Sequence, residues 1–184
     1  MTRTLILMFH PDPARSRANA ALAAAARALP EVEVIDMQAR HPAGVVDAAA
    51  EVALLRGAGR LVLQFPLHWY ATPAPMKAWM DAVLTRMFYI HPEEGRALDG
   101  VPLLVAVTAG NARDAYAPDG ANLFPMEDML APLRTTAHRC GMAWSAPFVV
   151  YRANRLDSAG LDAAGTAYAA RLRAFAGAVP ELAL

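Results

Sequence analysis

The chain has 184 residues, and its 17 lysines and arginines balance 17 aspartates and glutamates, giving a formal net charge of zero. We therefore expect no surface of one sign that would attract nucleic acid or an anionic membrane. Cys140 is the only cysteine, which excludes an intrachain disulfide and a cysteine-rich metal site. The length suits a single domain over residues 1–184.

No stretch predicts a targeting or membrane-spanning segment. The first apolar run, residues 1–9, contains one arginine and stops at His10-Pro11, so it is too short for the core of a signal peptide. No run reaches the roughly 18 apolar residues that a membrane span needs. We therefore expect a cytoplasmic protein.

Apolar strands and amphipathic helices alternate along the whole chain. Strands are predicted at residues 4–9, 32–36, 60–65, 102–108 and 143–151. Helices are predicted at residues 16–28, 46–57, 73–87, 124–139 and 158–175. This βα alternation indicates an α/β fold, a doubly wound five-stranded parallel sheet with helices on both faces and the strand order of flavodoxin.

The first strand leads into the segment H-P-D-P-A-R-S-R-A-N at 10–19. Ser16 is a candidate N-cap, and a helix that begins here with Arg17 nearby can hold a phosphate through its free N–H groups. An ordinary capped helix explains the same residues. The chain contains neither G-x-x-x-x-G-K-[ST] nor G-x-G-x-x-G, so a triphosphate loop and a dinucleotide fingerprint are not supported.

The third strand ends in an aromatic loop. Pro66 is expected to end the strand, Thr72 to cap the next helix, and Pro73 to stand at its first position. The loop 67–70 between them is left at the carboxyl end of the strand. Apolar residues then recur at helical spacing in a single stripe: Met76, Trp79, Met80, Val83, Leu84 and Met87.

Three loops, 10–19, 66–72 and 108–123, are expected to meet at one edge of the sheet because each follows a parallel strand. In flavodoxin strand order the first and third strands of the chain flank the switch point at which flavin mononucleotide is held. An aromatic and mostly uncharged floor suits its flat ring. Trp69 and Tyr70 could instead pack in the core or in a dimer interface.

Other chemistries find little support. The five histidines show no metal-ligand spacing, so we expect no metal site. No G-x-S-x-G motif is present. Cys140 follows a predicted helix end, where the helix dipole raises the pKa of a thiol, so a structural role is expected.

With these segments assembled, the chain resembles the NAD(P)H:quinone oxidoreductase family of flavodoxin-like flavoproteins. Within it, the chain is similar to the short bacterial ancillary oxidoreductases of glutathione-regulated potassium efflux systems. The segments that carry the resemblance run in family order: H-P-D-P-A-R-S-R-A-N at 10–19, Q-F-P-L-H-W-Y at 64–70, P-A-P-M-K-A-W-M-D at 73–81, A-L-D-G at 97–100 and V-T-A-G at 107–110.

The resemblance implies an FMN site, with FAD as the alternative. It places the phosphate and ribityl chain at His10, Ser16, Arg17, Ala18 and Asn19. It places the flavin ring against Leu67, His68, Trp69 and Tyr70, and a loop over the ring at Thr108, Ala109, Gly110 and Asn111. Asn111 stands where the family typically has glycine.

The resemblance also implies catalytic residues. Tyr116 falls where these enzymes place a tyrosine near the pyrimidine edge of the flavin, and Asn122 falls where they place a histidine. Asparagine can donate a hydrogen bond to developing negative charge but cannot exchange a proton near neutral pH. Any proton relay would then use Tyr116 or water.

The implied reaction is a ping-pong hydride transfer from NADPH or NADH to a quinone or a similar flat electrophile. The implied assembly is a homodimer, to which Met87-Phe88-Tyr89-Ile90 is a candidate contributor. Two other functions stay open. One is regulation of a potassium efflux transporter, with redox activity secondary and the protein peripheral at the inner membrane. The other is a flavodoxin-like domain that carries single electrons or binds no flavin.

Overall fold

A parallel sheet forms the centre of the computed structural model, which describes residues 3–177. Its strand order is β2-β1-β3-β4-β5, and every paired strand runs parallel to its neighbour. The strands are β1 (Thr4–Met8), β2 (Val32–Asp36), β3 (Arg60–Pro66), β4 (Pro102–Thr108), β5 (Ala143–Trp144) and β6 (Phe148–Val150). The predicted flavodoxin strand order is confirmed.

The last strand differs from the prediction, because residues 143–151 form two short strands and the sheet therefore has six strands rather than five. Both pieces pair with β4. Ala143 pairs with Pro102, whereas Phe148 pairs with Ala106, so the edge strand gains one residue between these points. Pro147 lies in this bulge, and a residue without an N–H is tolerated there because the strand is at the edge.

Eight α-helices lie within residues 3–177: α1 (Ala18–Arg27), α2 (Met37–Arg40), α3 (Ala48–Leu55), α4 (Ala74–Thr85), α5 (Pro92–Gly95), α6 (Met126–Met129), α7 (Ala131–Arg139) and α8 (Ser158–Gly177). The predicted helix at 124–139 is two helices that meet at Leu130. The short helices α2 and α5 were not predicted. α2 begins where the Asp36 carboxylate accepts bonds from the N–H groups of Gln38 and Ala39.

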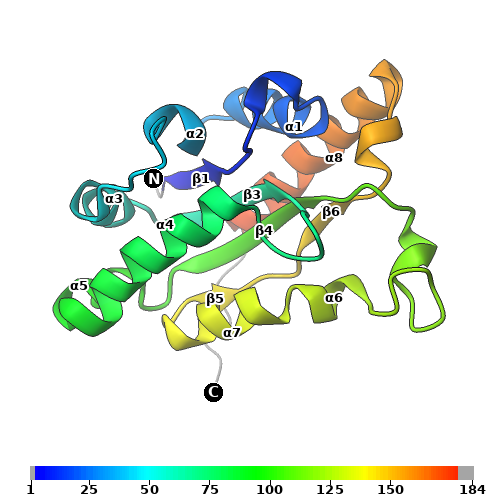
Figure 1. Ribbon diagram of the computed structural model, residues 1–184. Helices are drawn as coiled ribbons and strands as arrows, with labels where there is room; N and C mark the ends of the chain where they lie inside the picture. Colours follow the sequence, from blue (N-terminus) through cyan, green and yellow to red (C-terminus); the bar gives the residue numbers. More distant parts are fainter. Residues whose placement is uncertain (1–2, 178–184) are drawn as a thin grey trace.

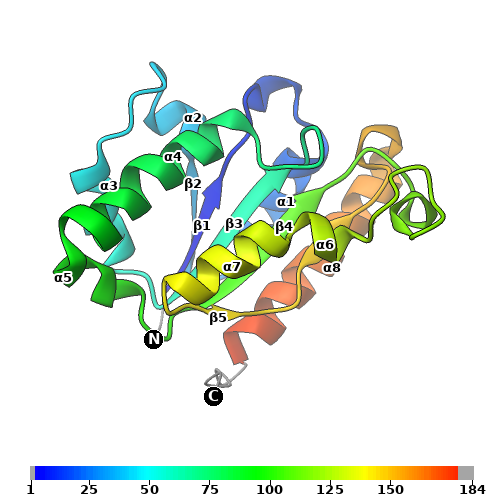
Figure 2. The ribbon, with the colours of Figure 1, turned by 60° about the horizontal axis from the view of Figure 1, so that its bottom comes forward.

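Alternate residues of the strands point to opposite faces of the sheet, and each face has its own core. Ile6, Val62 and Leu104 pack against α1 and α8, which lie together on one side. Leu7, Leu63 and the other odd-numbered positions of these strands pack against α3, α4 and α7. Figure 1 and Figure 2 show these two helical layers on either side of the sheet. Helices on both faces are thus confirmed.

Two predicted helix caps are wrong. α1 begins after Arg17, and Ser16 instead ends a 3-10 turn in which its N–H donates to the Pro13 carbonyl at 3.1 Å. α4 has Pro73 in the capping position, so Thr72 is one residue too early. Neither helix has a side-chain hydrogen bond at its cap, so the first N–H groups of α1 have no capping side chain.

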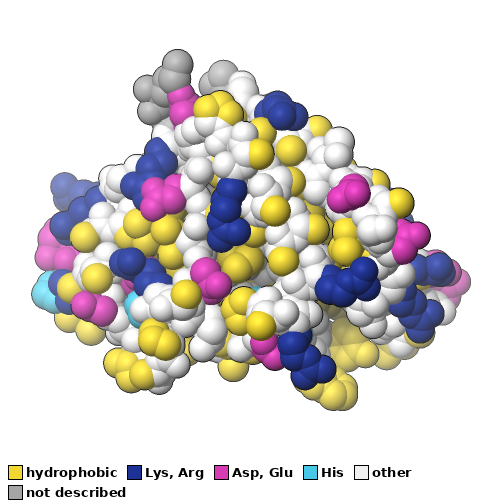
Figure 3. All heavy atoms as spheres, turned by 90° about the horizontal axis from the view of Figure 1, so that it is seen from above, with side chains coloured by type: hydrophobic (Ala, Val, Ile, Leu, Met, Phe, Trp, Pro, Cys, Tyr) yellow, Lys and Arg dark blue, Asp and Glu magenta, His cyan; other side chains and the backbone are white. Residues whose placement is uncertain are grey.

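The surface mixes charges of both signs. Figure 3 shows lysine and arginine side chains beside aspartate and glutamate side chains, with hydrophobic groups between them. None of the helices within residues 3–177 combines the length and the hydrophobicity that crossing a bilayer would require. The same described residues contain no cluster of three or more histidine, cysteine or acidic side chains placed to hold a metal ion.

Candidate functional site

A cavity of about 320 Å³ lies at the carboxyl edge of the sheet, and we call it the inner cavity. The loops that follow β1, β3, β4 and β6 all contribute to it, and Figure 1 shows the loops after β3 and β4 leaving the same edge. Its lining comprises His10, Arg15, Ser16, Arg17, Ala18, Asn19, Pro66, Leu67, His68, Thr108, Ala109, Gly110, Ala153 and Asn154. The predicted meeting of the three loops is present in the structure.

The N-terminus of α1 forms one wall of the inner cavity. The first backbone bond of the helix runs from the Ala21 N–H to the Arg17 carbonyl, so the N–H groups before it have no helical acceptor. Arg17 and Arg15 are exposed and line the same wall. Free N–H groups, the positive end of the helix dipole and two guanidinium groups together form a site suited to an anion.

Asn19 ties this helix terminus to the sheet. Its side-chain Nδ2 donates to Thr108 Oγ1 at 2.9 Å, and Gln64 Nε2 donates to the Asn19 backbone oxygen at 2.9 Å. All three residues are buried. The network therefore fixes the start of α1 against the ends of β3 and β4, which are the elements that surround the inner cavity.

His10 has a defined protonation state in this cavity. Burial and the neighbouring His68 ring, whose centroid is 6.5 Å away, lower the pKa of His10 below its ordinary value, so the ring is neutral at pH 7. The backbone N–H of Asp12 donates to His10 Nδ1 at 3.1 Å. The proton of the neutral ring is therefore on Nε2, which can act as a donor.

The aromatic loop after β3 is a tight two-residue turn. The N–H of His68 donates to the Ala71 carbonyl and the N–H of Ala71 donates to the His68 carbonyl, both at 3.0 Å. Trp69 and Tyr70 both have left-handed backbone, with φ of 47° and 63°. The Trp69 side chain is 93% exposed, whereas Tyr70 lies partly over a second cavity.

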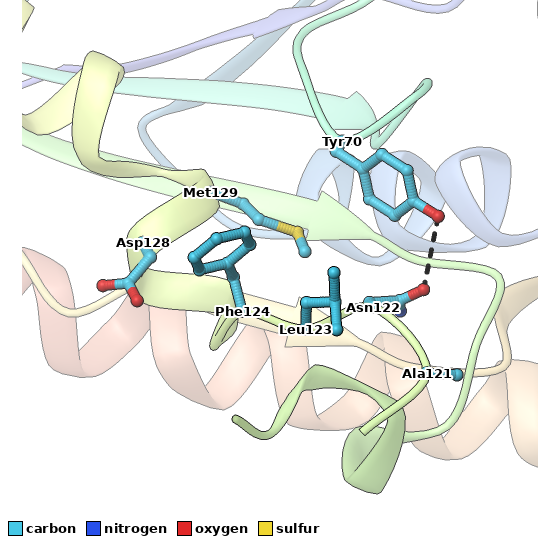
Figure 4. Close-up of a pocket in the computed structure, with 7 residues that line it drawn as sticks. All are labelled: Tyr70, Ala121, Asn122, Leu123, Phe124, Asp128 and Met129. Carbon is cyan, nitrogen blue, oxygen red and sulfur yellow. Dashed lines mark hydrogen bonds between the residues drawn. The ribbon is translucent and has the colours of Figure 1, made fainter. Parts of the chain in front are cut away.

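This second cavity, which we call the outer cavity, has a volume of about 590 Å³. Figure 4 shows it between the Tyr70 ring on one side and Leu123 and Phe124 on the other, with the Met129 thioether pointing into it. Asn122 lies at one end. Leu123 and Phe124 are 66% and 59% exposed, so the opening is apolar.

The Asn122 amide is held by two neighbours. Its Oδ1 accepts from the Tyr70 hydroxyl at 3.4 Å and from Asn111 Nδ2 at 3.2 Å, while its Nδ2 is buried without a partner. Gly120 makes this loop possible, because a Cβ at that position would lie 2.4 Å from the Asp114 carbonyl oxygen. The backbone of Asn111 is not left-handed, so this residue contributes through its side chain.

Tyr116 is placed differently from the other predicted site residues. Its side chain is 9% exposed and packs against Tyr151, with ring centroids 5.5 Å apart. It is not among the residues that line the inner or the outer cavity. Burial raises the pKa of Tyr116, opposed by a backbone hydrogen bond at Asn111, so the phenol is protonated near neutral pH.

Most predicted residues therefore come together at this edge. The inner cavity gathers His10, the residues 16–19, Leu67, His68 and 108–110, while Tyr70 and Asn122 line the outer cavity and Asn111 joins them by a hydrogen bond. Trp69 lines neither cavity. Reasoning from sequence did not assign Arg15, Ala153, Asn154, Leu123 or Phe124 to the site, although each lies in a loop after a strand of this sheet.

These features define a flavodoxin-like α/β protein with a cavity at the switch point of its sheet. The sequence matches the flavodoxin-like fold family over residues 2–173, and the chain belongs to this family. The glutathione-regulated potassium-efflux system ancillary protein KefG of Pectobacterium carotovorum is 40% identical over 166 residues, which cover 90% of each chain. The chain is thus a relative of these ancillary proteins.

Two solved structures are also similar. The general stress protein 14 of Treponema denticola, solved in complex with FMN, has 31% sequence identity and a TM-score of 0.85, covering 94% of this chain and 99% of its own. An NADPH-quinone reductase of P. pentosaceus has 26% identity and a TM-score of 0.79, covering 92% of this chain and 97% of its own.

Proposed function

We propose that this protein is a flavin-dependent NAD(P)H:quinone oxidoreductase with FMN as its cofactor. The observation that carries the proposal is the inner cavity itself, which runs from the N-terminus of α1 to Leu67 and His68 at the start of the aromatic turn. A flavin mononucleotide requires a phosphate site at one end and a flat apolar surface at the other. The FMN complex of the similar stress protein supports this choice.

The residues present fit FMN. Ser16, Arg17, Ala18 and Asn19 would hold the phosphate through N–H groups and the guanidinium, and His10 Nε2 would donate to the ribityl chain. The ring would rest against residues 67–70, under the loop 108–111. FMN would supply the two-electron chemistry by which one hydride and one proton convert a quinone to its hydroquinone, leaving oxidised nicotinamide.

The two predicted catalytic side chains, Tyr116 and Asn122, do not exchange protons near neutral pH. Tyr116 has a raised pKa and Asn122 does not titrate, so neither changes charge near neutral pH. Asn122 would donate a hydrogen bond where negative charge develops, and the acceptor would take its proton from water, because Tyr116 is buried and lines neither cavity. We expect the rate of quinone reduction to vary little between about pH 7 and 8, because burial holds the pKa of His10 below its ordinary value.

An absorption spectrum of the purified protein tests the proposal. A flavin band that bleaches on anaerobic addition of NADPH, and returns on addition of menadione, would support both half-reactions. Comparing NADH with NADPH identifies the reductant, and chromatography of the released flavin separates FMN from FAD. A protein that shows no flavin band, even after incubation with FMN or FAD, would refute it.

The relationship to the potassium-efflux ancillary proteins supports a second function, binding to a potassium efflux transporter at the inner membrane from the cytoplasmic side. Co-purification with the transporter encoded in the same genome, and potassium efflux with and without this chain, test it. Normal efflux in a strain that lacks the chain would refute the regulatory role and leave the redox role untouched.

We also propose a homodimer. In the segment predicted to contribute to it, Met87 is buried, whereas Tyr89 and Ile90 are 73% and 64% exposed. The Arg139 guanidinium lies 5.8 Å from the ring centroids of Phe88, which packs against the core, and of the exposed Tyr89. Exposed aromatic groups of this kind favour an interface. Sedimentation of the flavin-loaded protein as a monomer would contradict the proposal.

A further inference from the structure

A third cavity, of about 330 Å³, lies between helices α4 and α7, and we call it the helix groove. Lys77 and Met80 of α4 line one side, Leu133 and Thr136 of α7 line the other, and Phe65 of β3 forms part of its floor. It shares Leu67 and Tyr70 with the predicted cofactor site, and none of its other lining residues has a role in the proposed reaction. Its position beside the outer cavity indicates the kind of molecule that binds in it.

The helix groove adjoins the outer cavity. Tyr70 and Met129 line both spaces. The Tyr70 ring is held by its hydroxyl bond to Asn122, whereas the Met129 side chain is unbranched and can change its rotamer. A molecule whose flat end lies in the outer cavity can therefore extend between Tyr70 and Met129 into the helix groove.

Two polar side chains along the helix groove have partners. Thr136 Oγ1 donates to the Pro132 carbonyl at 2.9 Å, and Lys77 Nζ donates to the Asp81 carboxylate at 2.7 Å. The Lys77 side chain is 61% exposed, so its charge faces solvent. No residue lining the groove is among the residues within 3–177 that have a buried, unpartnered polar atom. Most of the lining residues are apolar, so the groove suits a hydrocarbon.

We propose that the helix groove binds the isoprenoid tail of a prenylated quinone whose head group occupies the outer cavity. The inference rests on the proposed function and specifies its acceptor as a lipid quinone. A cavity of about 150 Å³ holds one benzene molecule, so the groove has room for roughly ten to twelve carbon atoms, or about two isoprene units. Longer tails would leave the groove past Lys77 toward solvent.

A quinone series with one head group tests this. The flavin-loaded protein is assayed with 2,3-dimethoxy-5-methylbenzoquinones that carry zero, one or two isoprene units. Burying a methylene favours binding by about fourfold, so partial burial of two units should raise kcat/KM at least about tenfold, mainly through a lower KM. Geraniol, which has two isoprene units and no quinone, should compete with the two-unit quinone and not with the tail-free quinone.

Adjacent threonines of α7 provide a matched pair of variants. Thr136→Trp fills the helix groove, whereas Thr135→Trp places the same group on an exposed position that lines none of the three cavities described here. We expect Thr136→Trp to lose the dependence on tail length and Thr135→Trp to retain it. If Thr136→Trp does not fold, the geraniol competition on the unmodified protein decides alone.

The possible failures are distinguishable. Equal kcat/KM for all three quinones, or geraniol that competes with none of them, would overturn the tail site and leave the proposed oxidoreductase intact. Absence of turnover with every quinone would refute the proposed function itself. A change of oligomeric state in Thr136→Trp alone, by analytical ultracentrifugation, would assign the groove to a second copy of this chain and also overturn the tail site.

Discussion

The hydrogen bond between Asn19 and Thr108 gives the sharpest test of how the site is built. Thr108 is 5% exposed and Asn19 is 2% exposed, so neither finds water as a substitute partner. Thr108→Val removes the hydroxyl that accepts from Asn19 Nδ2 at 2.9 Å while nearly preserving the shape of the side chain. The buried amide donor is then left without an acceptor.

An unsatisfied buried donor costs about 1–3 kcal/mol, and we expect Thr108→Val to lower the free energy of unfolding by that amount. For a domain of this size, 1 kcal/mol corresponds to a shift in Tm of about 2–4 °C. Asn19→Leu removes the donor, while Gln64 Nε2 keeps its bond to the backbone oxygen at position 19. Because the double variant has neither partner, its loss should be smaller than the sum of the two single losses by roughly 0.5–3 kcal/mol.

Urea unfolding followed by far-UV circular dichroism measures these free energies, and quenching of flavin fluorescence measures FMN affinity on the same samples. We expect Thr108→Val to weaken FMN binding, because the network positions the N-terminus of α1. Additive losses in the double-variant cycle, or unchanged stability and affinity in Thr108→Val, would refute the role of this bond.

Three further predictions follow from single residues. Arg17→Ala should weaken FMN binding about 10- to 100-fold, which is the contribution of a charge-assisted hydrogen bond. Because Arg17 is exposed, urea unfolding should be unchanged, and an equal affinity for FMN would contradict its role in phosphate binding. Tyr168→Phe should raise the free energy of unfolding by about 1 kcal/mol, because the buried hydroxyl has no partner; a loss of stability on urea unfolding would indicate that it has one. Burial raises the pKa of Cys140 from 9.0 to about 11, so the folded protein favours the neutral thiol. The contribution of the neutral thiol to stability is present below pH 9 and is lost as the pH rises toward 11. Cys140→Ala should therefore remove this part of the pH dependence of Tm. An identical pH dependence of Tm in both proteins would show that the thiol is not its cause.

The fold was largely predictable because its determinants are local. β2 and β4 form at the predicted residues. The run in β4 is apolar because this central strand is covered on both faces, whereas the edge strand β2 includes the exposed Glu33. The wrong predictions concern features that depend on tertiary contacts. Pro147 produces a bulge only because β5 and β6 pair with β4 at different registers, and no local pattern shows the pairing register of an edge strand.

The site was predictable to the extent that it depends on strand order. Once β1, β3 and β4 are adjacent and parallel, the loops after them must meet. Asn154 follows β6 and lines the same cavity. It was missed because the loop after the last strand was not included among the loops that meet at this edge of the sheet. The positions of Leu123 and Phe124 depend on how the long loop after β4 folds back, which the tight packing at Gly120 determines.

The turn at residues 68–71 links the fold to the candidate site. A two-residue turn with left-handed backbone at both positions is favoured by Asn-Gly, yet this chain has Trp69 and Tyr70 there. Left-handed backbone at residues other than glycine costs about 1–3 kcal/mol each, so the sequence sacrifices stability at this point. This backbone places Tyr70 so that its hydroxyl donates a hydrogen bond to Asn122. The Tyr70 ring lines both the outer cavity and the helix groove. Because the strain falls on a residue that lines two cavities and bonds the Asn122 amide, we expect Tyr70 to contribute to binding more than to folding.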